Sequence, residues 1–362
     1  MHRYLKKMWP TAAASLILLT NIAQADVDSS QLRNLDNRVS ALEQKKGASG
    51  MINPPGRPQV KDGADLFVTA DFIYWNAHEN GLPLAVRNKG STTNLSNADV
   101  VYLKSEWDPG FRVGVGYNLP HDGWDTTFTY LHFFTDADRH THAQGGRADF
   151  ASQGADQDSF NTKSKGHWNL HLSQLDLNLG REFFVSKWLT LRPNFGLRTA
   201  WIKQSLRARY KGFDYVPALK TKVDEKCNFW GLGVVAGMDS QWGLGSGWSI
   251  FGNAGFSLLY GFFHNDVDQN TITVNKFVDL DGSYRTSTFV ADLAIGLRWD
   301  HMFDRDRYHI SFQGGWEHHL YAGQNQFIRF YSNIADNNLG GIFSNQGDLT
   351  LQGWTLSARF DF

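Results

Sequence analysis

The sequence predicts an all-β protein: a transmembrane up-and-down antiparallel β-barrel of about ten strands, preceded by a short N-terminal periplasmic helix. Three observations indicate this fold: an alternating strand at the C-terminus, an export signal at the N-terminus, and connections that alternate between short and long. Mean hydropathy is only -0.40, yet 14% of the residues are aromatic and there are 35 glycines against 9 prolines. This composition suits a barrel in which every second residue faces lipid.

The C-terminal segment carries the clearest pattern. An apolar set alternates with a polar one over the last nine residues: Trp354, Leu356, Ala358, Phe360 and Phe362 against Thr355, Ser357, Arg359 and Asp361. Period two gives a strand one apolar and one polar face. The alternative is the edge strand of a soluble sandwich. A closing strand that ends on an aromatic residue is typical of outer-membrane barrels, so we expect a barrel-assembly signal at Trp354, Leu356, Phe360 and Phe362.

The N-terminus resembles a secretory signal peptide. Arg3, Lys6 and Lys7 precede a short apolar run at 11–19, and Ala23-Gln24-Ala25 forms a small-x-small cleavage site. The apolar run is too short to span a bilayer as a helix, although a retained anchor is the alternative. We expect residues 1–25 to be removed, so that the mature chain starts at Asp26.

Two segments separate the signal from the barrel. Within 26–45, Leu32, Leu35, Val39 and Leu42 follow the 3-4-3 spacing of a coiled-coil seam. This segment is either a short helical leader that associates subunits or a solvated, partly helical one, since two heptads are marginal alone. Residues 46–63 are rich in glycine and proline and are expected to be a linker. The barrel is then residues 64–362.

Ten segments alternate between apolar and polar residues: 66–75, 111–118, 124–130, 168–182, 189–201, 230–239, 248–258, 292–299, 308–317 and 354–362. In the fourth, the apolar face changes near Ser173, which predicts a β-bulge. Each segment is long enough to cross a membrane as a tilted strand. Twelve strands are the alternative, with Val100–Leu103 as the piece to be added.

The connections alternate in length. The short ones are 119–123, 184–187, 241–247 and 300–306, and the long ones are 77–105, 135–166, 203–226, 262–287 and 321–348. Outer-membrane barrels have short periplasmic turns and long external loops, and ten strands place every connection accordingly. Tryptophans would then form the interfacial girdles: Trp124, Trp188, Trp242, Trp248 and Trp299 on the periplasmic side, and Trp75, Trp107, Trp168 and Trp201 on the outer side.

Seven charged residues are predicted to face the interior: Asp71, Arg112, Arg192, Arg198, Asp292, Arg298 and Glu317. Charges are tolerable there because the interior is wet or the charges pair, whereas on the lipid face they cost several kcal/mol. The functional interpretation is a pore lining. The alternative is a plugged, ion-paired interior, because barrels of eight strands are filled by side chains and those of 16–18 are open.

Other chemistries find little support. Removing residues 1–25 leaves 32 basic and 36 acidic residues, so nucleic acid is not an expected partner. His132, His140, His142, His318 and His319 lack the spacing of a strong zinc site, and no cofactor, metal or enzymatic turnover is predicted. The single Cys227 is either an idle thiol or forms an intermolecular disulfide.

Several motifs resemble a known family. They are 70–75 (ADFIYW) with 77–82 (AHENGL), 108–117 (DPGFRVGVGY) with 121–124 (HDGW), 191–198 (LRPNFGLR) and 358–362 (ARFDF). They are similar to those of the major outer membrane protein-like, pore-forming family of Legionella and chlamydia-related bacteria, over about 64–362. The chlamydial members are cysteine-rich and disulfide cross-linked, and one cysteine puts an envelope cross-linking role in doubt.

The resemblance implies a porin-like surface protein of the bacterial outer membrane that lets ions and small hydrophilic solutes diffuse passively. The rival function is a closed barrel acting as a structural surface protein or host-cell adhesin. The expected partners are outer-membrane lipid and lipopolysaccharide, the barrel assembly machinery, further copies in a homo-oligomer such as a trimer, and host-surface molecules. An outer-membrane lipid hydrolase would need a Ser/His pair that the sequence does not reveal.

Overall fold

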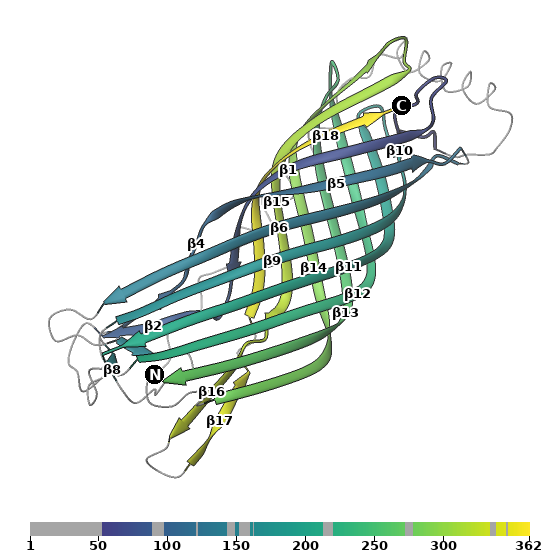
Figure 1. Cartoon of the computed structure of the whole chain (residues 1–362). Coiled ribbons are helices and arrows are strands. Elements are labelled where there is room, and N and C mark those ends of the chain that lie inside the picture. The colour runs from purple at the N-terminus through teal and green to yellow at the C-terminus, as the bar shows by residue number, and fades with distance from the viewer. Residues whose placement is uncertain are drawn as a thin grey trace, which may run out of the picture. The chain divides into compact units, whose positions relative to one another are not determined.

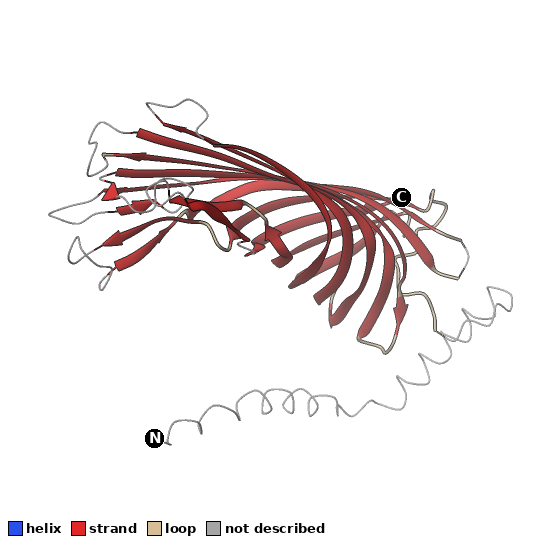
Figure 2. Cartoon of the chain, turned by 90° about the horizontal axis from the view of Figure 1, so that it is seen from below, coloured by secondary structure: helices blue, strands red, loops and turns tan. Residues whose placement is uncertain are grey.

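The structure, a computed structural model, describes residues 53–88, 98–120, 122–142, 149–151, 160–161, 163–212, 220–271, 278–333, 338–344 and 347–362. All regular structure in these ranges is β-strand (Figure 2). None of the described residues forms a helix long and apolar enough to cross a membrane. The predicted signal peptide, the helical leader and the start of the linker lie outside the described residues.

Ten strands form a closed antiparallel ring, which confirms the predicted fold class. In ring order they are β1 (Leu66–Glu79), β5 (Trp107–Asn118), β6 (Trp124–His142), β9 (Lys163–Arg181), β11 (Leu189–Lys211), β12 (Lys220–Gly245), β13 (Trp248–Thr271), β14 (Val278–Phe303), β15 (Tyr308–Asn325) and β18 (Gly347–Asp361). The ring closes because β18 pairs with β15 on one side and with β1 on the other, from Phe67↔Asp361 to Glu79↔Leu349.

Shorter strands lie at the two ends of the ring (Figure 1). β10 (Phe183–Phe184) and the C-terminus lie at the turn end, where β5, β12 and β14 connect to their successors through 119–123, 246–247 and 304–307. At the opposite loop end, β4 (Lys104–Ser105) pairs with β6, and β16 (Ile328–Asn333) pairs with β17 (Asn338–Ser344). Short turns mark the periplasmic end of outer-membrane barrels, so we expect the loop end to be external.

The piece predicted as an additional strand is not part of the ring. β3 (Ala98–Tyr102) belongs to a separate four-stranded sheet with β2 (Pro83–Asn88), β7 (Asp149–Ala151) and β8 (Phe160–Asn161). Its residues form a strand, as the alternative expected, but they pair with β2 beyond the ring. The ring therefore has ten strands and not twelve.

Two predicted long loops are mostly strand. β11 pairs with β12 up to Lys211↔Lys220, and β13 pairs with β14 up to Gln269↔Val278, so the expected loops 203–226 and 262–287 are largely ladder. The lipid-facing pattern ends before the strands do. Outward residues become charged while inward residues remain buried, and a search for apolar alternation therefore ends each strand too early.

The bulge predicted near Ser173 is absent. β9 pairs with β6 and β11 in unbroken register through this position. Leu170 and Leu172 are fully buried inside the ring, whereas Leu175 and Leu177 face outward. The strand keeps its alternation, and the interior changes from polar to apolar. Leucines that face the interior are followed along β9 by leucines that face lipid, and in the sequence this looks like a change of the apolar face.

The outward residues form an apolar band around the ring. They include Phe111, Val113, Phe195, Leu197, Leu232, Val234, Phe256, Leu258, Leu293, Ile295, Trp354 and Leu356, all well exposed. Trp188, Trp242 and Trp248 lie on this face near the turn end. The girdle positions predicted for Trp75 and Trp168 are wrong, because both side chains are buried inside the ring. Trp75 donates its Nε1–H to Thr355 and Trp168 donates to Gln204.

A charge in the middle of the band is expected to destabilise the barrel. Val234 lies on β12 and is 62% exposed. Val234→Arg should lower the free energy of unfolding in a lipid bilayer by about 2–4 kcal/mol. Asn228→Arg is the matched control, since it lies on the same face of the same strand beyond the band and should change stability by about 0.5 kcal/mol or less. Denaturant unfolding in vesicles measures both, and equal losses would contradict the assigned band.

Candidate functional site

All seven charged residues predicted to face inward line one interior cavity of ≈ 350 Å³. They are Asp71, Arg112, Arg192, Arg198, Asp292, Arg298 and Glu317. Strand alternation places them there, since their neighbours along each strand form the apolar outer band. The cavity extends from Leu131 and Tyr321 to Glu182 and Arg359 near the turn end.

A chain of ion pairs crosses the interior from β1 to β14. Arg112 donates to Asp71 at 2.7 Å and to both oxygens of Glu317 at 2.7 and 2.8 Å. The ring nitrogens of His319 lie 3.1 Å from Glu317 and 2.7 Å from Asp292. An imidazole can donate from both nitrogens only when it is protonated. His319 therefore bridges two carboxylates, and its protonated form donates to both of them.

Arg198 continues this chain on the other side of Asp292. Its guanidinium donates to Asp292, and to both oxygens of Asp176 at 2.8 and 2.9 Å. Its Nη1 also donates to Ser257 at 3.2 Å. Arg198 is 6% exposed, so these hydrogen bonds take the place of water. A buried guanidinium requires such partners, because an unpaired charge at this depth is strongly destabilising.

Two further networks occupy the part of the cavity nearest the turn end. Arg192 binds Asp125 and, at 2.8 Å, Asp239. The second network is a chain of contacts that runs from Arg298 through Asp300, His309 and Asp361 to Arg359. His309 again presents both ring nitrogens to carboxylates, at 3.1 and 2.7 Å.

Glu182 lies in the turn between β9 and β10, at the mouth of the cavity. Burial raises the pKa of its carboxyl, and nearby arginines partly oppose that rise. The segment that precedes β1 is held at the same rim. Gly56 donates to the carbonyl of Glu182, and Arg57 donates to the carbonyls of Leu119 and Trp124.

An apolar layer fills the interior on the loop side of the cavity. We define it as Ile73, Trp75, Phe133, Leu170, Leu172, Ile202, Phe229, Leu259, Phe263 and Val290, which are buried in one cluster. The Phe229 and Phe263 rings lie 4.6 Å apart, and Trp75 lies 5.6 Å from Phe133 and 4.5 Å from the His319 ring. The layer thus borders the ion pairs directly. A search for a lipid-facing period misses it because its apolar residues point inward.

Residues that could ligate a metal lie elsewhere. Among the described residues, two groups near the loop end bring their ligand atoms within 4.8 Å of one another: Asp136, Asp138 and His167, and His264, Asp266 and Asp281. The histidines already contact carboxylates in each group, and the side chains are partly or fully exposed. The histidines at 318 and 319 occupy opposite faces of β15, as their alternation indicates.

The ion-pair partners are the part of the site that sequence reasoning missed. Asp125, Asp176, Asp239, His319 and Arg359 all line or border the cavity. Alternation places each of them on an inward face, so that signal was present. The pairing itself joins residues as far as 205 positions apart, as in Arg112 with Glu317, and no sequence pattern links them.

Comparison with known proteins identifies one family. A family model described as the Legionella pneumophila major outer membrane protein precursor matches residues 57–362. No curated protein matches the chain.

Solved structures with similar folds share little sequence. They include the outer membrane protease OmpT from Escherichia coli (6% identity, 84% of this chain and 99% of that chain, TM-score 0.40). The translocator domain of the autotransporter NalP from Neisseria meningitidis has 12% identity, with coverage of 92% and 98% and a TM-score of 0.33. A major outer membrane protein from Thermus thermophilus has 11% identity, with coverage of 82% and 99% and a TM-score of 0.27. Scores this low favour no function over another.

Removing the central guanidinium is expected to destabilise the barrel strongly. Arg198→Leu should cost about 3–5 kcal/mol, because it leaves the buried Asp176 carboxylate without its guanidinium and leaves Asp292 in contact with His319 alone. Adding Asp176→Asn should recover part of this loss. Arg207→Leu, on the outer face of the same strand with a 55% exposed side chain, should cost about 1 kcal/mol or less. Denaturant unfolding in vesicles measures all three, and similar costs for Arg198 and Arg207 would contradict the paired interior.

Proposed function

The chain belongs to the Legionella major outer membrane protein family, and from this premise we propose that it is a porin-like channel for passive diffusion of ions and small hydrophilic solutes. The family and the closed barrel indicate the bacterial outer membrane. The observation that carries the channel proposal is the charged cavity inside the ring. A membrane protein has no need of ionised groups in its interior unless they pair, meet water or contact solutes.

The cavity suits a vestibule that begins at the periplasmic end. Its lining residues include Glu182, Arg298 and Arg359 near the turns, and it continues to Arg112 and Asp292 deeper in the ring. Six carboxylates and five guanidinium groups line it, together with His319. Because these charges nearly balance, we expect weak selectivity between cations and anions.

The apolar layer is the proposed constriction. Narrow apolar segments stop ion flow by excluding water, and they conduct when they widen or become wet. Strand β1 contributes Ile73 and Trp75 to the apolar layer. The chain continues from β1 directly into the segment that carries β2. A displacement of these side chains would join the vestibule to the external end.

The apolar layer also favours a second function. A ring of ten strands lies close in size to the filled eight-stranded barrels, and buried ion pairs together with the apolar layer occupy much of its interior. A permanently closed barrel would serve as a structural surface protein or host-cell adhesin, with its external loops as the working surface. The two functions differ in whether the folded protein conducts.

Single-channel recording in a planar bilayer tests the choice. We expect discrete current steps from the purified, heat-modifiable protein. Phe263→Ser should increase the open probability several-fold, because a hydroxyl in the apolar layer favours water there. Phe256→Ser is the matched control: Phe256 lies on the same strand but faces lipid and should leave gating unchanged. Silence from folded wild-type and folded Phe263→Ser protein would reject the channel and leave the closed barrel.

Ion selectivity tests the lining. Gln313 lines the cavity without a charge, beside Arg298 in the β14–β15 register. Gln313→Glu should shift the reversal potential in a salt gradient towards cations and Gln313→Lys towards anions, each from a wild-type value near zero. The same pair of changes at Ser287, which faces outward on β14, should have little effect. Equal shifts at both positions, or none at Gln313, would place the current path elsewhere.

A further inference from the structure

Basic side chains cover one sector of the outer wall beyond the apolar band. They belong to β9, β11 and β12, face away from the ring and are exposed. We call this set the basic column: Lys163, Lys165, Lys203, Arg207, Arg209, Lys211, Lys220, Lys222 and Lys226. Tyr210 and Val223, which alternate with its members, point inward and are buried. The column is therefore the solvent-facing side of a continuous three-stranded ladder.

Cations occupy directly opposed positions in this ladder. Arg209 is the register partner of Lys165 on one side and of Lys222 on the other. One step further out, Lys211 faces Lys163 and Lys220 in the same way. Like charges directly opposite one another on adjacent strands destabilise a sheet. The row of Lys165, Arg209 and Lys222 thus carries a repulsive cost that a bound anion would offset.

Carboxylates neutralise only part of the column. Asp224 contacts Lys222 and lies 3.9 Å from Arg207, and Asp266 lies 4.0 Å from Lys226. Within the described ranges, no ion pair joins Lys165, Lys203 or Arg209 to a carboxylate. The two flanking strands carry acidic residues on their outer faces: Asp136 and Asp138 on β6, and Asp266 and Asp268 on β13. Among the described strands, directly opposed rows of lysine and arginine occur on β9, β11 and β12.

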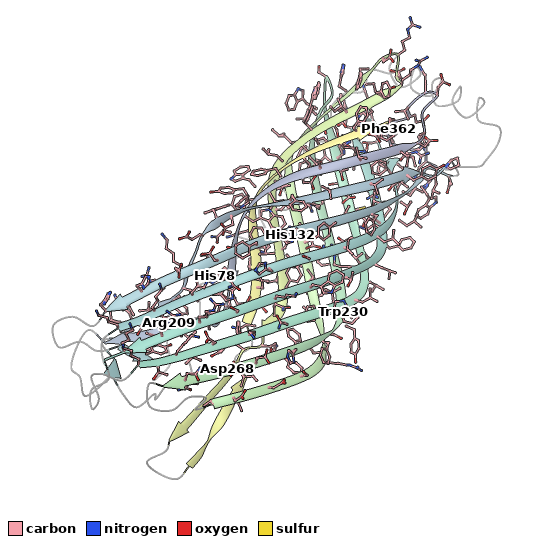
Figure 3. The ribbon with its side chains drawn as sticks, viewed as in Figure 1. His78, His132, Arg209, Trp230, Asp268 and Phe362 are labelled. Carbon is pink, nitrogen blue, oxygen red and sulfur yellow. The ribbon has the colours of Figure 1, made fainter. Side chains whose placement is uncertain are left out.

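The column starts where the lipid-facing surface ends. Lys203 follows Trp201 on the outer face of β11, and Lys226 lies two outward positions from Trp230 on β12. The ten residues from Trp201 to Lys211 rise about 33 Å along the strand, or about 25 Å along the membrane normal at the usual tilt. In Figure 3, Arg209 lies near the loop end and Trp230 nearer the turn end. The column runs from the membrane surface outward.

We propose that the basic column binds a phosphorylated glycolipid of the outer leaflet, whose acyl chains lie against the apolar band and whose anionic headgroup and sugar core extend along β9, β11 and β12. Phosphate oxygens accept charge-assisted hydrogen bonds from lysine and arginine. Each such cation near a membrane surface strengthens the binding of anionic lipid about fivefold.

A membrane-anchored ligand fits this surface better than a soluble polyanion. Lys203 and Lys226 sit immediately beyond Trp201 and Trp230, where lipid headgroups gather, and the column continues outward from them without a break in pairing. A soluble sulfated polysaccharide would reach the outer rows but would have no reason to require the cations nearest the lipid. The binding is also independent of whether the interior conducts.

The test compares two triple variants of the full-length protein, refolded in detergent. Lys165→Gln, Lys203→Gln and Arg209→Gln together neutralise the column. Lys104→Gln, Arg139→Gln and Arg285→Gln together remove three exposed cations that lie outside the column. Each is titrated with purified bisphosphorylated lipopolysaccharide, with its dephosphorylated form, and with heparin. Heat-modifiable electrophoretic mobility verifies folding first.

We expect the column variant to bind bisphosphorylated lipopolysaccharide about 100-fold more weakly than wild type, or about fivefold per cation. The control variant should bind like wild type, and dephosphorylated lipopolysaccharide should bind wild type weakly. Unchanged affinity of the folded column variant would overturn the proposal, as would equal binding of the dephosphorylated form. Binding of heparin without binding of lipopolysaccharide would overturn it too, and would assign the surface to a soluble polyanion.

Discussion

The closed ladder of backbone hydrogen bonds is the constraint on which the rest of this structure depends. No water reaches the hydrocarbon core, so every peptide N–H and C=O of a membrane strand must find a partner. Pairing of β18 with both β15 and β1 satisfies the last free edge. Once the ring is closed, alternation along each strand assigns each side chain to lipid or to the interior. The outer face is therefore apolar, and the inner face carries the charged residues.

Burial inside the ring then forces the charged residues into pairs. Arg112, Arg192 and Arg198 each contact two carboxylates. His309 bridges Asp300 and Asp361, and His319 bridges the Glu317 and Asp292 carboxylates that Arg112 and Arg198 also contact. A small ring has little room for water to screen unpaired charges. The same networks that make the interior polar also tie several strands together, so the proposed conduction path is part of what stabilises the barrel.

The wall of the barrel combines three surfaces along one ladder. β11 shows all of them: Phe195 faces lipid, Arg198 and Ile202 face the interior, and Arg209 faces the external solvent. The ladder extends past the membrane because its inward residues remain buried at that height, as Tyr210 does. This continuity presents cations at fixed spacing directly above the lipid, where a loop would not hold them in rows.

Local alternation by itself determined the strand positions, the even count and the inward placement of all seven charged residues, because side-chain direction depends only on position along a strand. Prediction from alternation failed where both faces of a strand are apolar, and where the outer face of a strand is polar. Leu170 and Leu172 predict a bulge that does not exist, Trp75 and Trp168 mimic girdle residues, and the polar outer face beyond Trp201 predicts loops in place of strands. Only the tertiary structure decided the ion-pair partners, the apolar layer and the rows of opposed cations. These features depend on register and closure between strands far apart in sequence, and that information is set by packing across the ring.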